Sequence, residues 1–112
     1  MLFRSVGTGN GQPVNAELSP AAKTRLAHRL GTAARDAFAR GDWEPAARGF
    51  REALEVDPGA PEADELRLMI AVIHVRRLPD PQRATEALDG IGSRLPEKLR
   101  PLVDQLRAEL AG

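Results

Sequence analysis

Apolar residues recur at spacings of three and four over most of this 112-residue chain, which is the period of an α-helix. The clearest stripe accompanies a predicted helix over residues 44–56 and is formed by Trp43, Ala46, Ala47, Phe50, Ala53 and Leu54. Similar stripes occur in residues 20–40, 61–78, 81–95 and 97–110. No segment shows the sustained alternation that is typical of a half-buried strand. The pattern therefore predicts an all-α fold of about five helices.

Residues that start and stop helices flank these stripes. Ser19-Pro20 and Asp80-Pro81 each place a capping side chain before a proline, which is favourable at the first helical position. Gly41-Asp42 predicts a left-handed glycine at the end of the first helix, with Asp42 as the N-cap of the second. Asp57-Pro58 ends that second helix, because the residue before a proline is disfavoured in the α region. The helices are therefore expected to be joined by short loops and to pack as antiparallel neighbours.

Two features modify this picture. Gly31 lies inside the first stripe, where glycine costs about 1 kcal/mol relative to alanine. It predicts a kink, a close approach of another backbone, or a division of the segment into two helices. Glycine, proline and asparagine interrupt residues 1–18, which are expected to form a flexible or docked N-terminal arm. The helical domain is expected to occupy residues 19–112.

The segment Gly41–Pro58 resembles the second half of a tetratricopeptide repeat. That pattern has a Gly-Asp turn, an aromatic residue, then alanine, aromatic, alanine and a closing proline; here it is carried by Gly41, Asp42, Trp43, Ala46, Phe50, Ala53 and Pro58. The resemblance implies antiparallel helical hairpins stacked as a short right-handed solenoid. Two repeats, about Ala27–Ala60 and Glu65–Leu95, would be followed by a capping helix over Glu97–Leu110. In the second repeat, Pro79-Asp80 replaces the Gly-Asp turn.

The segment 61–78 is apolar on nearly all sides, and such a helix is either buried or faces a partner. The resemblance implies that one side packs against neighbouring helices, whereas the other lines a groove that binds peptides. The implied groove residues are Arg35, Phe38, Leu66, Met69, Ile70, Ile73 and Arg77. Some members of the family bind carboxylates there through a Lys, Asn and Arg cluster, whose places hold Gly31, Arg35, Ile70 and Ile73 in this chain. An apolar peptide or helical segment of a partner protein is therefore the expected ligand.

Other interpretations of segment 61–78 remain open. It is equally consistent with the ordinary core of a five-helix domain. The N-terminal arm, through Leu2, Phe3 and Val6, is a second candidate to cover its apolar face. A second copy of the chain could also cover this face. The protein would then be a self-associating assembly subunit or homodimer instead of a peptide-binding scaffold.

Composition narrows the class of function. Sixteen basic and sixteen acidic residues cancel, so overall charge predicts neither nucleic acid nor an anionic membrane as a partner. Cysteine is absent, which excludes disulfides and thiolate metal sites. No apolar run reaches the ~18 residues of a membrane span, and the N-terminus lacks the apolar core of a secretory signal. A cytoplasmic protein is expected. Arginine outnumbers lysine fourteen to two, a bias that suits a GC-rich bacterial genome.

Candidate catalytic chemistry is sparse. His28 and His74 are the only histidines, and they lie on separate predicted helices without a carboxylate at metal-ligand spacing. The glycine-rich segment 7–11 has no following lysine and no preceding strand, so it does not predict a phosphate loop. The sequence therefore predicts a protein that is not an enzyme and that uses neither a metal nor a cofactor.

Overall fold

The computed structural model describes residues 18–112, and this part of the chain contains five α-helices and no strand. They are α2 (Pro20–Arg40), α3 (Trp43–Val56), α4 (Ala63–Arg76), α5 (Pro81–Gly90) and α6 (Arg100–Ala111), with a short 3₁₀ turn, η2 (Glu97–Leu99), before α6. The prediction of an all-α fold is confirmed. The predicted N-terminal arm lies outside the described residues, except for Leu18.

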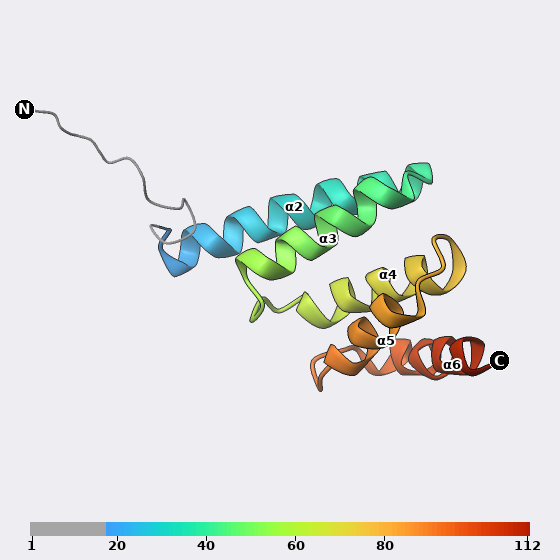
Figure 1. Cartoon of the computed structure of the whole chain (residues 1–112). Coiled ribbons are helices and arrows are strands. Elements are labelled where there is room, and N and C mark those ends of the chain that lie inside the picture. Colours follow the sequence, from blue (N-terminus) through green and yellow to red (C-terminus); the bar gives the residue numbers. More distant parts are fainter. Residues whose placement is uncertain (1–17) are drawn as a thin grey trace, which may run out of the picture.

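Consecutive helices run in alternating directions and pack against one another (Figure 1). Helices α2 and α3 form a long hairpin, and α4 contacts both α3 and α5. Helix α6 covers α4 and α5 at the end of the molecule opposite to α2 (Figure 1). Short connections between antiparallel neighbours produce this order, as the stop signals in the sequence predict.

Local capping fixes most of the helix boundaries. The Ser19 hydroxyl accepts a hydrogen bond from the backbone N–H of Ala22 (3.1 Å), and Asp80 accepts one from Arg83 N–H (3.1 Å). Gly41 has φ of 82° and ends α2 in the left-handed conformation. The prediction that the Asp42 side chain caps α3 is wrong, because it forms no such bond and instead accepts from Arg40 Nε (3.2 Å). Three of the four predicted caps are therefore confirmed.

Two glycines mark where α2 meets its neighbours. Helix α2 is continuous through Gly31, so the segment is not divided. A Cβ on Gly31 would lie 3.7 Å from Leu66 Cδ2, an ordinary contact with a side chain of α4. The close approach of another helix occurs at Gly49 instead, where an added Cβ would lie 2.9 Å from the Cβ of Ala34. Glycine at position 49 therefore lets α3 approach α2.

The other helix boundaries differ from the prediction by a few residues. Helix α4 is shorter at both ends than the predicted 61–78, and α5 ends at Gly90 instead of continuing to position 95. Ile91 is extended (φ −69°, ψ 125°), and the following segment returns to the start of α4. Pro101 lies in the first turn of α6, where its missing N–H leaves no helical hydrogen bond unmade.

The core extends along the whole stack. Its largest fully buried side chains are Phe50 from α3, Leu66 and Ile73 from α4, Leu88 from α5 and Leu106 from α6. Burial of each such side chain stabilises the fold by about 1.5–3 kcal/mol. Eight of the fourteen residues of α4 are buried, which makes α4 the central helix. Its apolar circumference is thus used largely by its own neighbours.

Candidate functional site

A cleft runs along one face of α4, between α3 and α5. It consists of two cavities of about 390 Å³ and about 480 Å³ that share Arg51 and Arg83. We call the two cavities together the α4 cleft. Its lining residues are Glu44, Arg51 and Leu54 of α3, Arg67, Ile70 and His74 of α4, Arg77 to Asp80 of the following turn, and Arg83, Glu86 and Ala87 of α5.

The cleft residues of α4 and of its C-cap lie on one face of that helix. Arg67, Ile70, His74 and Arg77 follow one another at spacings of three and four. Arg67 and Arg77 are ten residues apart, so a rise of ~1.5 Å per residue separates them by about 15 Å along the helix axis. The cleft is therefore long enough for a short peptide segment.

The first cavity has an apolar floor and an arginine rim. Leu54, Ile70 and Ala87 form the floor. Arg51, Arg67 and Arg83 line the same cavity, and each comes from a different helix. Among residues 18–112, Glu86 is the one acidic residue that lines it. Three helices thus each contribute one arginine to the lining of this cavity.

The helices themselves hold two of these guanidinium groups. Arg67 Nη1 donates to Asp64 Oδ1 (3.0 Å), and Arg83 Nε lies 3.4 Å from Asp80 Oδ2, each pair spanning one helical turn. Arg67 is also confined from the α5 side, because a Cβ on Gly90 would lie 3.1 Å from Arg67 Nε. Within residues 18–112, Arg51 forms no ion pair.

Aromatic residues support the second cavity. Arg77 stacks over the ring of Trp43, with 4.8 Å between the guanidinium carbon and the ring centroid. Trp43 in turn contacts Phe38 edge to face, at a centroid distance of 5.0 Å and an interplanar angle of 86°. Such cation–π and edge-to-face contacts hold the side chains in one arrangement. The tip of the α2–α3 hairpin is thereby joined to the end of α4.

His74 lies at the base of the second cavity and is only 6% exposed. Its Nδ1 lies 3.0 Å from the carbonyl oxygen of Leu78, a geometry that requires the proton on Nδ1. Nε2 is buried without a hydrogen-bond partner within the described chain. The ring therefore closes the turn after α4.

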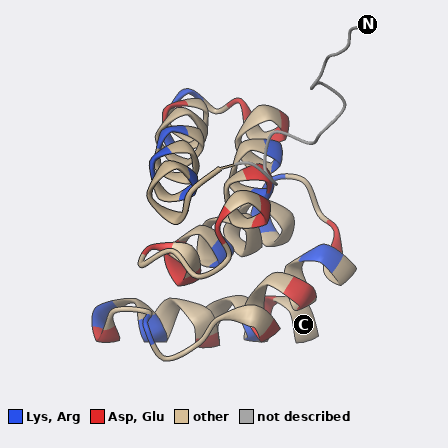
Figure 2. Cartoon of the chain, turned by 90° about the vertical axis from the view of Figure 1, so that its left-hand side faces the viewer, with Lys and Arg blue, Asp and Glu red and all other residues tan. Residues whose placement is uncertain are grey.

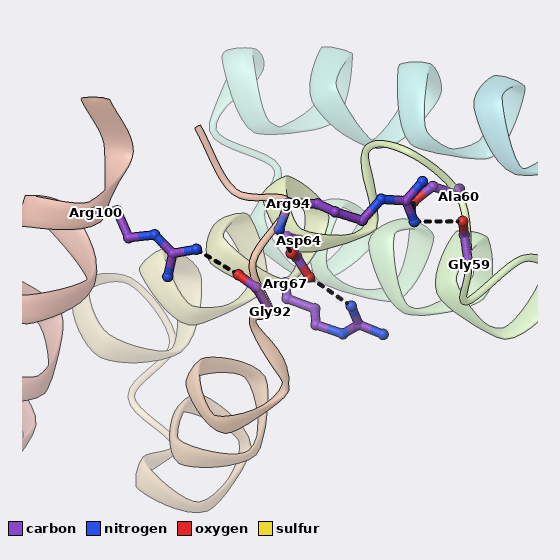
Figure 3. Close-up of polar contacts among 7 residues, drawn as sticks. All are labelled: Gly59, Ala60, Asp64, Arg67, Gly92, Arg94 and Arg100. Carbon is purple, nitrogen blue, oxygen red and sulfur yellow. Dashed lines mark hydrogen bonds and ion pairs between the residues drawn. The ribbon is translucent and has the colours of Figure 1, made fainter. Parts of the chain in front are cut away.

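A buried carboxylate adjoins the cleft but has a structural role (Figure 3). Asp64 is 5% exposed; besides Arg67, it accepts a hydrogen bond from the backbone N–H of Arg94 (3.0 Å). Burial alone would raise the pKa of Asp64, but hydrogen bonds from Gly92, Arg94 and Arg67 lower it below its ordinary value. The carboxylate therefore fastens the segment after α5 to the start of α4.

Two arginines extend this fastening (Figure 3). Arg94 Nη1 donates to the carbonyl of Gly59 (2.9 Å), and Arg100 Nη2 donates to that of Gly92 (2.7 Å). These bonds connect the loop before α4, the segment after α5 and the start of α6. The donors and acceptors named here are thus engaged with one another.

The structure places the seven sequence-predicted groove residues on different surfaces. Leu66 and Ile73 are 1% and 0% exposed and belong to the core, which corrects their placement on an open apolar face, whereas Ile70 is 5% exposed and packs in the core while also lining the cleft. Met69 and Phe38 are half-buried against the same core, whereas Arg35 and Arg77 are exposed. Of the seven, Ile70 and Arg77 line the α4 cleft.

Sequence reasoning missed Arg51, Leu54, Arg67 and Arg83. Arg51 and Leu54 lie three residues apart on α3, a spacing that indicates a shared helix face. The sequence carries no signal that Arg67 and Arg83 converge on that face, because each belongs to another helix. Helix packing brings them together.

The described residues offer no metal centre and no membrane span. Within residues 18–112, no three His, Cys, Asp or Glu side chains are grouped as metal ligands. His28 Nδ1 lies 3.5 Å from Glu62 Oε2, at the opposite end of α4 from His74. No helix in this range is long and apolar enough to cross a bilayer. Both signs of charge are interspersed along the helices (Figure 2).

No protein-family model matches the chain, and no match was found among curated proteins or solved structures.

Proposed function

We propose that this protein is a non-catalytic protein-interaction module of tetratricopeptide-repeat type that binds a segment of a partner protein in the α4 cleft. The observation that carries the proposal is the convergence of Arg51, Arg67 and Arg83 from three helices around the floor formed by Leu54, Ile70 and Ala87. A concave apolar surface with a few oriented polar groups is the usual form of a binding site.

The chemistry of the cleft suits a polypeptide. An apolar side chain buried on its floor would contribute about 1.5–3 kcal/mol before association costs. The planar guanidinium groups at the edge can pair with carboxylates in two-pronged geometry and so fix the orientation of a chain. Arginine and tryptophan are also enriched among residues that dominate protein interfaces.

The segment Gly41–Pro58 supports the repeat assignment. Gly41 adopts the left-handed turn, and Ala46, Phe50 and Ala53 are fully buried, in keeping with the scaffold positions of such a repeat. The hairpin α2–α3 and the pair α4–α5 would be its two repeats, and α6 the capping helix. This reading makes the described helices a rigid support for the cleft.

Site-specific photo-crosslinking tests the proposal. A benzophenone amino acid replaces Leu54 in the cleft or, as the control, the exposed Asp104 of α6. In cells that express the chain, we expect position 54 to give a discrete crosslinked partner that position 104 does not give. Crosslinking from 54 should decrease when Arg51→Gln is added.

Two results would contradict the proposal. Equal crosslinking from both positions, or none from position 54, would mean that the cleft is not an interaction surface. A crosslinked product made only of two copies of this chain would instead favour the self-associating assembly subunit, and light scattering at two concentrations would then show a dimer.

A further inference from the structure

We infer that the α4 cleft binds an acidic segment that combines a large apolar side chain with carboxylates. This inference rests on the proposed function and specifies the class of partner. It replaces the purely apolar ligand that the sequence predicts, because the surface left open beside α4 is not purely apolar.

One of the three arginines of the first cavity forms no ion pair within the described chain. Arg51, Arg67 and Arg83 face one acidic residue, Glu86, among its lining groups. The partner carboxylate of Arg67 is buried Asp64, whose other oxygen already accepts from a backbone N–H. Arg51 has no ion pair within the described chain and is half-buried. A ligand carboxylate at Arg51 would therefore meet a cation that is partly removed from water, where ion pairing is stronger.

The second cavity offers another free cation. Arg77 is exposed, stacks on Trp43 and forms no ion pair within residues 18–112. The nearby Asp80 is already engaged, since its two oxygens contact the backbone N–H and the guanidinium of Arg83. Within residues 18–112, the cleft thus presents two guanidinium groups without a carboxylate partner, Arg51 from α3 and Arg77 from the C-cap of α4.

The acidic residues of the cleft favour a peptide over nucleic acid. Glu44 lines the second cavity and Glu86 the first, so negative charge accompanies the arginines along the length of the cleft. A continuous polyphosphate would be repelled at these positions, whereas a peptide can place carboxylates at the arginines only. Leu54, Ile70 and Ala87, the apolar residues that line the first cavity, suit an apolar side chain, which a polyphosphate backbone does not offer.

The dimensions set the length of the segment. The face from Arg67 to Arg77 covers about 15 Å. An extended chain advances ~3.3 Å per residue, so four or five residues reach from one end to the other. A helical ligand would need about ten residues for the same length.

Fluorescence anisotropy with a defined peptide tests the inference. The probe is a labelled octapeptide in which two leucines are flanked by aspartate and glutamate. The comparison peptides replace all carboxylates by amides, or both leucines by serine. A labelled single-stranded oligonucleotide is the polyphosphate probe. We expect the acidic leucine peptide to bind at least about tenfold more tightly than each of the three.

Variants locate the binding. Arg51→Gln and Arg77→Gln should each weaken binding by about tenfold, because each removes a charge-assisted contact. Arg48→Gln is the matched control, since Arg48 is exposed on the same helix α3 but lines a different surface. It should change binding by less than about twofold. Circular dichroism and urea titration confirm that all three variants remain folded.

Several results would overturn the inference. One is equal affinity for the acidic and the amide peptides. Another is an equal loss of peptide affinity in Arg48→Gln and Arg51→Gln. A third is an affinity for the oligonucleotide that equals the affinity for the acidic peptide. Sequencing the partner segment that is crosslinked from position 54 tests the acidic ligand and the proposed function separately. A partner segment without acidic residues would refute this inference and leave the proposed function standing. Failure of position 54 to crosslink any partner would refute the proposed function itself.

Discussion

Replacement of Gly49 by alanine tests how closely α2 and α3 approach. The new Cβ would lie 2.9 Å from the Cβ of Ala34. Carbon atoms attract at separations of ~3.5–4.0 Å, so this contact is at least about 0.6 Å too short. Neither atom can rotate away, because each is fixed to its helix backbone. The two helices must therefore separate or shift.

The expected cost follows from two opposing terms. Overpacking of this kind costs about 1–3 kcal/mol. Alanine gains about 1 kcal/mol over glycine in helix propensity. The free energy of unfolding of Gly49→Ala should therefore fall by about 0–2 kcal/mol. Gly31→Ala is the matched control, because its Cβ would lie 3.7 Å from Leu66 Cδ2 and needs no rearrangement. It should raise stability by about 0.5–1 kcal/mol.

Urea titration followed by far-ultraviolet circular dichroism measures both variants. The decisive quantity is the difference between them, which should be about 1–3 kcal/mol in favour of Gly31→Ala. The double variant Ala34→Gly/Gly49→Ala removes the clashing atom, so a double-mutant cycle should show favourable coupling between the two positions. If Gly49→Ala stabilises the protein as much as Gly31→Ala does, or if the coupling is zero, the close packing of these helices is refuted.

Three further predictions concern contacts that hold the ends of helices. Gly41→Ala should lower the free energy of unfolding by about 1–2 kcal/mol, because its φ of 82° is unfavourable for any residue with a Cβ. Urea titration will measure this change, with Gly59→Ala as the control. Arg77→Gln should lower stability by about 0.5–1 kcal/mol and change the fluorescence of Trp43, the one tryptophan of the chain, whereas an unchanged emission spectrum would contradict the stacking. Asp64→Asn should cost about 1.5–3 kcal/mol at neutral pH, because it weakens hydrogen bonds to a buried charged group. Since the pKa of Asp64 is lower in the folded chain than its ordinary value of 3.8, its contribution is complete above that pH and is lost as pH falls below it. Arg76 likewise lowers the pKa of Glu109 by a hydrogen bond, so Glu109 also makes stability depend on pH. The free energy of unfolding must therefore be measured against pH for both the wild type and Asp64→Asn over the same acid range. Parallel curves of unfolding free energy would show that Asp64 makes no pH-dependent contribution.

The sequence predicted the helices well because helix formation and capping depend on residues close together in the chain. Ser19, Gly41 and Asp80 act on backbone groups within about four positions of themselves. Asp42 shows the limit of such reasoning. It lies at the expected N-cap position, but Arg40 competes for its carboxylate, and a pattern of residue types does not reveal which contact is preferred.

The candidate site was predicted far less well. An apolar circumference on α4 is the same pattern whether the helix is covered by neighbours or open to a ligand. The structure resolves this for Leu66, Ile70 and Ile73, which α4 buries in the core. What remains open beside them is bordered by arginines.

By itself, then, the sequence determined an all-α chain, its order of helices and the turn at Gly41, since these depend on local periodicity and capping. The tertiary structure alone decided which apolar face of α4 is covered and where the α4 cleft lies. The physical reason is the distance along the chain between the contributing residues. Arg51, Arg67 and Arg83 belong to three separate helices, and only the packing of α3 and α5 against α4 brings these residues to one cavity.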